Sequence, residues 1–172
     1  MRGSPVNVRE SLDRLLSAET GVDLAAMEPN DIIVQRTPLR EDSASFAGRP
    51  EEESPVWVLV TRGRGVVSCS RLLYRVACAW AEDFAAADHL LRPEFLDDLR
   101  CEVARSMAAE VHVETWRIFT RDRPDAPEVV SLTTSQTGPV VLCLSDDRIS
   151  AHKLIASGAV EYGRLVRMVA RR

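Results

Sequence analysis

Residues 56–61, Val-Trp-Val-Leu-Val-Thr, constrain the fold of this chain more than any other segment. Five of these six residues are β-branched or aromatic, and apolar side chains occupy both alternating sets of positions. A strand with this pattern buries both of its faces, as strands do in the interior of a sheet that helices cover. We therefore predict a central strand here.

Hydrophobic periodicity predicts four helices and five further strands. The helices are expected at 7–20, from Ser68 or Ser70 to about Ala87, from Pro93 to Met107, and from Asp146 or Asp147 to Ser157. The strands are expected at 31–35, 110–120, 128–134, 139–144 and 160–169. Helices cluster in mid-chain and do not alternate with strands, which favours an α/β (α+β) fold over a doubly wound one. We expect a mixed, mostly antiparallel sheet covered by helices.

Finer features of these elements follow from side-chain pattern. Asn7 and Glu10 have the spacing of a capping box, and Gly21 is suited to end the first helix. One apolar face of the 70–87 helix is predicted to comprise Leu72, Leu73, Val76, Ala77, Trp80 and Phe84. The last strand is predicted to place Val160, Tyr162, Val166 and Met168 on one face.

Length and composition predict a single domain over residues 1–172. The chain is 45% hydrophobic and carries 22 Lys+Arg against 26 Asp+Glu, a net charge of −4. This acidic balance argues against nucleic-acid binding, and no apolar run approaches the ~18 residues of a membrane span. The start of the sequence lacks the apolar core of a signal peptide, so we expect a cytoplasmic protein. The polar segment at about 37–54 is expected to be a mobile surface loop.

The cysteines and histidines do not predict a metal site. Cys69, Cys78, Cys101 and Cys143 contain no CxxC pair, and His89, His112 and His152 have no ligand spacing. All four cysteines lie among apolar neighbours, so we expect buried, reduced thiols.

The segment Thr61-Arg62-Gly63-Arg64-Gly65-Val66-Val67 lies between the central strand and the predicted helix. Backbone amides of a glycine-rich turn that leads into a helix suit a phosphate group. The predicted binding residues are therefore Arg62, Gly63, Arg64, Gly65 and Val66. The other interpretation is a tight hairpin turn, in which the glycines serve only to allow positive φ.

Two short motifs resemble the GCN5-related N-acetyltransferases. Arg62 and Gly65 match the coenzyme A loop of that family, Gln/Arg-x-x-Gly-x-Gly/Ala, whereas Val67 stands at its last position. The segment 158–164, Gly-Ala-Val-Glu-Tyr-Gly-Arg, resembles the family's closing Gly-Phe-x-x-x-Gly-Arg element, with Ala159 in place of phenylalanine. Leu154 stands where many members carry a catalytic tyrosine, so no catalytic residue is assigned.

The resemblance implies a bacterial, cytoplasmic enzyme with an acetyltransferase-like fold, which moves an acetyl group from acetyl-CoA to an amine.

Gly65 and Gly158 are 93 positions apart, farther than the family usually places these elements. The first 130 residues resemble instead the amino-terminal half of two-part members, where a Pro-Glu-x-Leu-like helix matches Pro93–Leu96. The alternative is therefore a non-catalytic accessory or interaction domain that lacks a complete coenzyme A site and binds a small molecule or a partner. A homodimer is compatible with both the acetyltransferase and the accessory-domain interpretation. A coenzyme A cleft over Gly63–Gly65 requires the strand ending at Thr61 to splay from its neighbour.

Other candidate residues favour structural roles. Ser68, Ser70 and Ser135 lack the Gly-x-Ser-x-Gly context of a serine hydrolase. The pairs Asp97-Asp98 and Asp146-Asp147 could act as paired carboxylates, but adjacent helical residues diverge and the second pair suits a helix cap.

Overall fold

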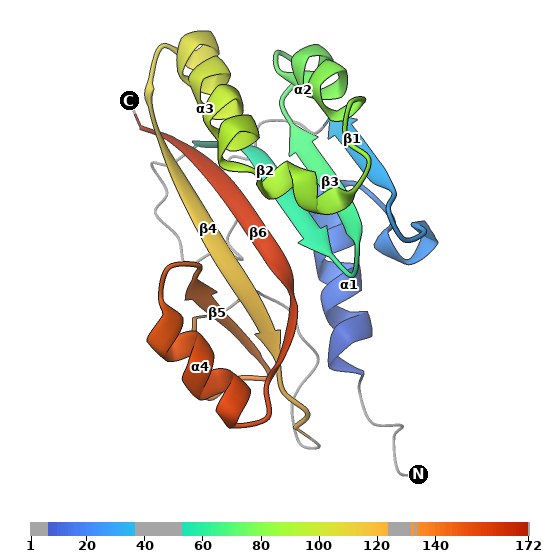
Figure 1. Cartoon of the computed structure of the whole chain (residues 1–172), viewed down its shortest axis with the longest axis vertical. Coiled ribbons are helices and arrows are strands. Elements are labelled where there is room, and N and C mark those ends of the chain that lie inside the picture. The colour runs from blue at the N-terminus through green and yellow to red at the C-terminus, as the bar shows by residue number, and fades with distance from the viewer. Residues whose placement is uncertain (1–6, 37–52, 124–131, 133, 172) are drawn as a thin grey trace.

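A computed structural model of the chain describes residues 7–36, 53–123, 132 and 134–171. Over these residues it contains α-helices (α), 3-10 helices (η) and strands (β) (Figure 1). Their order is α1 (Val8–Thr20), η1 (Leu24–Ala26), β1 (Ile32–Arg36), β2 (Glu53–Thr61), β3 (Arg64–Cys69), α2 (Tyr74–Ala81), η2 (Ala87–Leu91), α3 (Pro93–Met107), β4 (Glu110–Thr120), β5 (Val140–Leu144), α4 (Arg148–Ala156) and β6 (Val160–Arg171).

The six strands form one sheet in the order β1-β3-β2-β6-β4-β5. β1 is parallel to β3, and every other neighbouring pair is antiparallel. The predicted mixed, mostly antiparallel sheet is therefore confirmed. β2 lies inside the sheet, between β3 and β6, as the run at 56–61 predicted.

Helices cover both faces of the sheet (Figure 1). α1 and η1 lie behind it, and Leu12 and Leu16 of α1 pack with Trp57 and Leu59 of β2 in one core. On the other face, α2, η2 and α3 cover a second core that includes Val56, Val58 and Val60. α4 covers a third, smaller core around Phe119 and Val141. The alternating apolar positions of β2 thus face two different cores, which explains why the whole run is apolar.

Residues at the helix ends explain where three of the helices begin or end. Asn7 accepts a hydrogen bond from the Arg9 amide (3.1 Å), and Gly21 ends α1 with φ 75°. Glu10 accepts from the Asn7 side-chain amide (3.1 Å), whereas the predicted capping box would use the Asn7 backbone. Pro93 occupies the first turn of α3, and Asp147 caps α4 by accepting from the Ser150 amide (3.0 Å).

The predicted helix from Ser68 or Ser70 to Ala87 is wrong at both ends. Residues 64–69 continue as β3, paired with β2 from Thr61–Arg64 to Val56–Cys69. The helix begins only at Tyr74, and Leu72, predicted on its buried face, is 72% exposed. Val66 and Val67 bury their side chains on opposite faces of the sheet, and this alternation outweighs the capping tendency of the serines.

The helix also ends early, at Ala81, and η2 follows as a separate element. Ala87 and Leu90 of η2 pack over Gly65. A Cβ atom at Gly65 would lie 2.5 Å from Leu90 Cδ1 and 3.2 Å from Ala87 Cβ. The absence of a side chain at Gly65 thus allows η2 to lie close against β3.

The predicted common face of the last strand is also wrong. Tyr162 packs in the core beneath α1, whereas Val166 and Met168 pack in the core beneath α3. The register between β4 and β6 shifts here: Ile118 pairs with Gly163, but Phe119 pairs with Glu161. Tyr162 is therefore the extra residue of a β-bulge, which reverses the alternation of side chains along β6. Val160 is exposed.

Some predictions fall on residues outside the described part of the chain. The segment 37–52 of the predicted loop lies outside it, while residues 53 and 54 belong to β2. Most of the predicted strand 128–134 also lies outside; of its described residues, Leu132 is buried and neither Leu132 nor Thr134 is in a strand.

The cysteines are only partly as predicted. All four are free thiols, and Cys69 and Cys143 are buried. Cys78 is half-buried, and Cys101 is exposed on α3, so the prediction of burial is wrong for Cys101. Its neighbours in sequence are helical, and only the side of α3 that carries Phe95, Leu99 and Val103 faces the sheet.

Within the described residues, no helix combines the length and the apolar character needed to cross a membrane.

Candidate functional site

A groove of about 570 Å³ lies on the sheet face that carries α2, α3 and α4. One wall comes from the end of η2 and the start of α3, and the other from the turn between β5 and α4. The middle of β4 and β6 forms the floor. The lining residues are Leu91, Pro93, Leu96, Val113, Glu114, Thr115, Leu144, Ser145, Asp146 and Arg164.

The spacing of the helices leaves this part of the sheet open. α3 packs toward Val111 and Met168, whereas α4 packs on Phe119 and Val141. Between these two contact regions Val113 remains 37% exposed in the floor of the groove. The second wall is fixed to the floor, because the Ser145 amide donates a hydrogen bond to the Thr115 carbonyl (2.8 Å).

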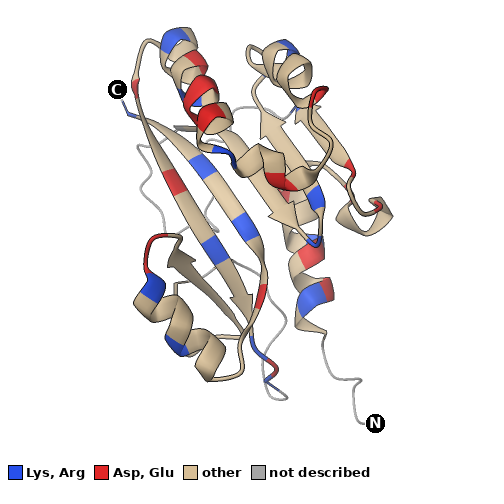
Figure 2. Cartoon of the chain, in the orientation of Figure 1, with Lys and Arg blue, Asp and Glu red and all other residues tan. Residues whose placement is uncertain are grey.

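Charged residues lie along β4 and β6 between α3 and α4 (Figure 2). Glu161 accepts hydrogen bonds from Arg117 Nη2 (2.7 Å) and Arg117 Nε (3.2 Å), and from Arg164 Nε (3.3 Å). Burial disfavours the charged form of Glu161, but the hydrogen bonds from both arginines outweigh this effect and lower its pKa. One carboxylate thus holds two guanidinium groups, and this cluster of three residues carries a net positive charge.

Arg164 is the cation that lines the groove, and its side chain is 45% exposed. Within the described chain, the hydrogen bond of its guanidinium is the one from Nε to Glu161. The terminal nitrogens, Nη1 and Nη2, are therefore available to a ligand. Guanidinium groups suit planar anions such as carboxylates.

The two carboxylates in the lining differ in their partners. Glu114 accepts hydrogen bonds from Arg167 Nε (3.2 Å) and Trp116 Nε1 (3.4 Å) and is thereby occupied. The Asp146 carboxylate has neither a hydrogen bond nor an ion pair to any described residue, and it does not pair with Arg164. Asp146 and Asp147, which the sequence suggested as a pair, therefore have different positions: Asp147 caps α4, and Asp146 lines the groove.

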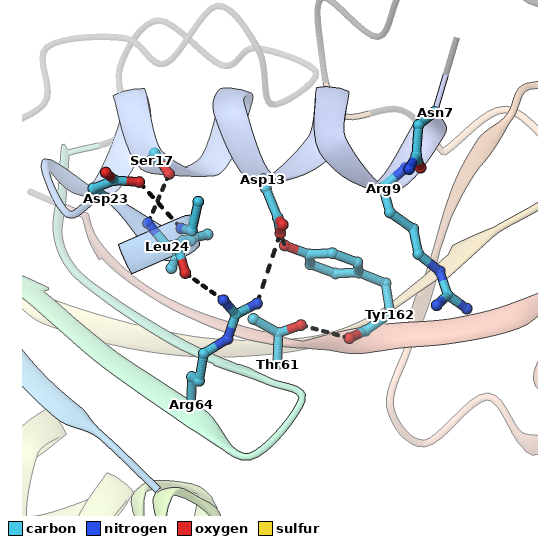
Figure 3. Close-up of polar contacts among 10 residues, drawn as sticks. Asn7, Arg9, Asp13, Ser17, Asp23, Leu24, Thr61, Arg64 and Tyr162 are labelled. Atoms are coloured by element: carbon cyan, nitrogen blue, oxygen red, sulfur yellow. Dashed lines mark hydrogen bonds and ion pairs between the residues drawn. The ribbon is translucent and has the colours of Figure 1, made fainter. Parts of the chain in front are cut away.

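A second polar cluster lies beneath α1 and joins segments that are far apart in sequence (Figure 3). The Tyr162 hydroxyl donates a hydrogen bond to Asp13, and Arg64 Nη1 donates to the Leu24 carbonyl. Arg64 Nη2 lies 3.9 Å from Asp13 Oδ1. The Thr61 hydroxyl donates to the Tyr162 carbonyl (2.7 Å), beside the bulge.

This second cluster is internal. Arg64 is only 8% exposed, and Tyr162 is 3% exposed. Burial, together with the hydrogen bond to the Asp13 carboxylate, raises the pKa of Tyr162 well above its usual range. The hydroxyl is therefore protonated at neutral pH and acts as a donor. We interpret the cluster as the polar attachment of α1 to the sheet.

The predicted phosphate-binding residues lie in a β-hairpin. Arg62 (φ 50°) and Gly63 (φ 73°) form its two-residue turn and are exposed. Arg64 is held beneath α1, the Gly65 amide donates to the Asp31 carbonyl (2.8 Å), and Val66 is buried in the core. The helix that was expected to follow the turn is replaced by β3, so the turn is that of a β-hairpin. Of its two glycines, Gly63 has positive φ, whereas Gly65 allows the close approach of Ala87 and Leu90.

The strand that ends at Thr61 does not splay from its neighbours. Thr61 pairs with Arg64 on one side and with Gly163 on the other. The structural premise for a coenzyme A cleft over Gly63–Gly65 is therefore not met by the described residues. Coenzyme A binding at these five residues stays a prediction.

The remaining candidates have structural partners or lie on the surface. The Ser68 hydroxyl is buried and donates to the Thr20 carbonyl (3.1 Å), and Asp97 pairs with Arg100 (2.8 Å). His112 lies 3.5 Å from Glu110, and His152 is exposed on α4. Among the residues that the structure describes, no group of three or more His, Cys, Asp or Glu side chains is arranged to hold a metal ion.

Sequence reasoning did not identify Arg164 as a binding residue, and it considered Asp146 as half of a carboxylate pair but favoured a helix cap. The available signal was weak, because Arg164 is one of three arginines in the last strand, with Arg167 and Arg171. Comparisons of the chain with protein-family models, with curated proteins and with solved structures gave no match.

Proposed function

We propose that this chain is a non-catalytic binding domain, and that its groove binds a small organic acid with an apolar body. The observation that carries the proposal is Arg164, whose terminal nitrogens have no described partner at the floor of a groove that apolar and polar residues line in equal number. A volume of about 570 Å³ lies within the range of pockets for small molecules. Such pockets combine apolar walls with a few polar groups that orient the ligand.

The apolar part of the ligand has a defined place. Leu91, Pro93 and Leu96 line one wall, and Val113 lies in the floor. Covering the exposed part of Val113 removes apolar surface from water, which contributes roughly 25 cal/mol for each Å². An apolar body against this wall thus gains affinity without any polar contact.

The acidic group of the ligand pairs with Arg164. Glu161 holds Arg164 Nε, and Arg117 in turn holds Glu161 by two hydrogen bonds. This arrangement limits the motion of the guanidinium before a ligand arrives, so less conformational entropy is lost on binding. A carboxylate that accepts both terminal nitrogens is the group that best fits this donor.

The groove supports binding better than catalysis. Its lining, taken from the described residues, includes neither histidine nor cysteine, and no histidine of the lining stands beside the hydroxyls of Thr115 and Ser145 as a general base. The acetyltransferase expectation rests on the sequence resemblance alone, because the turn at Arg62–Gly63 precedes a strand and not a helix. The non-catalytic alternative is therefore the one that we adopt.

Titration calorimetry with 3-phenylpropanoate tests the proposal. We expect the wild-type protein to bind this acid and Arg164→Met to bind it about tenfold more weakly, because a charge-assisted hydrogen bond is lost. Arg75→Met is the matched control, since Arg75 is exposed on α2 and does not line the groove. Equal affinities for Arg164→Met and Arg75→Met would overturn the proposal.

A further inference from the structure

The groove contains two opposite charges that do not neutralise each other. Arg164 lies in its floor, and Asp146 lies in the wall formed by the turn between β5 and α4. The Arg164 guanidinium bonds to Glu161, and the Asp146 carboxylate bonds to no described residue. The two side chains form no ion pair with each other, and both line the same groove.

The other charged group of the lining does not disturb this arrangement. Glu114 is satisfied by Arg167, with Arg167 Nη2 3.1 Å from Glu114 Oε2, and by Trp116. The groove therefore offers a ligand one unsatisfied carboxylate and one partly satisfied guanidinium. A simple acid uses only the guanidinium and leaves Asp146 to repel its carboxylate.

We infer that the ligand is a zwitterion, an α-amino acid with a large apolar side chain. Arg164 receives its carboxylate, Asp146 receives its ammonium group, and Leu91, Pro93, Leu96 and Val113 contact its apolar side chain. This inference rests on the proposed function and specifies the ligand class of the same groove. The hydroxyls of Thr115 and Ser145 supply further polar contacts at the edge of the lining.

Three probes with one phenylethyl body separate the contributions of the two charges. L-phenylalanine carries both groups, 3-phenylpropanoate lacks the ammonium, and 2-phenylethylamine lacks the carboxylate. We expect the wild-type protein to bind phenylalanine about fivefold more tightly than 3-phenylpropanoate, the effect of one exposed ion pair. We expect 2-phenylethylamine to bind more weakly than phenylalanine.

Asp146→Asn tests the assignment of the ammonium contact. In this variant the affinity for phenylalanine should fall to that for 3-phenylpropanoate, while 3-phenylpropanoate should bind as tightly as before or more tightly. Asp147→Asn is the matched control, because Asp147 caps α4 without lining the groove and asparagine also caps helices. It should preserve the preference for phenylalanine.

The results distinguish this inference from the function on which it rests. If 3-phenylpropanoate binds as tightly as phenylalanine and Asp146→Asn changes neither affinity, the zwitterion inference is wrong and the organic-acid groove remains. If none of the three probes binds, the groove proposal fails together with the inference. A preference for phenylalanine that Asp146→Asn and Asp147→Asn reduce equally also overturns the inference.

Discussion

The hydroxyl of Tyr162 donates a hydrogen bond to the carboxylate of Asp13 and so joins the last strand to the first helix across 149 positions of sequence. The bond exists because a bulge in β6 turns Tyr162 toward α1. Without the bulge, the alternation of the strand would direct this side chain to the opposite face. The bulge therefore determines how α1 is attached to the sheet.

Removing either partner of this bond should destabilise the fold. Tyr162→Phe leaves the half-buried Asp13 carboxylate without this hydrogen bond, and we expect a loss of ~1.5–3 kcal/mol in the free energy of unfolding. Asp13→Asn should cost a similar amount, and the double variant less than the sum, because the two residues share one interaction. Urea denaturation of the four proteins measures this coupling.

Tyr74→Phe is the control, because Tyr74 is the other tyrosine of the chain and is only half-buried. We expect it to change stability by less than Tyr162→Phe does. Equal losses for the two substitutions, or full additivity of the Asp13 and Tyr162 variants, would show that the Tyr162–Asp13 bond does not stabilise the fold.

Two glycines should differ in their tolerance of alanine. A Cβ atom at Gly163 would lie 2.5 Å from the Val60 carbonyl oxygen and 3.1 Å from Thr61 Cα, both backbone atoms. At Gly65 the nearest atom is the end of the Leu90 side chain, which can move. We expect Gly163→Ala to cost ~3 kcal/mol and Gly65→Ala ~1 kcal/mol. Thermal denaturation ranks the two, and the reverse order would contradict the packing around the bulge.

The Glu161 cluster predicts a pH dependence. Hydrogen bonds from Arg117 and Arg164 outweigh the effect of burial and lower the pKa of Glu161 below 4.5, its ordinary value. The Glu161 carboxylate therefore takes up a proton at higher pH in the unfolded chain than in the folded chain. The free energy of unfolding decreases as the pH falls below about 4.5.

Glu161→Gln should remove that part of the pH dependence. The difference in unfolding free energy between the wild type and Glu161→Gln should be constant above about pH 5.5 and should shrink as the pH falls toward 3. Chemical denaturation at several pH values measures it. A difference that stays the same across this range would show that Glu161 is not held by the two arginines.

The hairpin at Arg62–Gly63 predicts a negative result with coenzyme A. Its turn is followed by β3, so no helix begins there whose backbone amides could hold a pyrophosphate. The Arg64 side chain is buried beneath α1 and does not face this turn's solvent side. We expect the melting temperature to stay constant during a coenzyme A titration. A stabilisation that Arg62→Glu abolishes would restore the acetyltransferase interpretation.

The sequence was most informative where periodicity was long and regular. The observed bounds of β4 and α3 match the prediction, because their apolar positions repeat over several alternations or turns. The bounds of α4 differ by one or two residues, and the informative signal there was the cap at Asp147. The hairpin was harder to predict, since its turn places Arg62, a residue other than glycine or asparagine, at positive φ. Ser68 and Ser70 then resembled helix caps although Ser68 lies in a strand.

The candidate groove could not be derived from sequence pattern, because four segments that are separate in sequence form it. The start of α3, the floor of β4 and β6, and the turn before α4 are brought together only by the order of strands in the sheet. The insertion of β6 between β2 and β4 places Arg164 next to residues of β4, and no local motif encodes this pairing. The bulge at Tyr162 is likewise a property of strand register.

The most direct test of the groove as the binding site is a nitrogen–proton NMR titration of the wild-type protein with 3-phenylpropanoate. We predict chemical-shift changes at the amides of Val113, Thr115, Ser145 and Arg164, which line the groove. The amides of Arg62 and Gly63, in the hairpin turn, should not change. Shift changes centred on the hairpin, with none in the groove, would contradict the account.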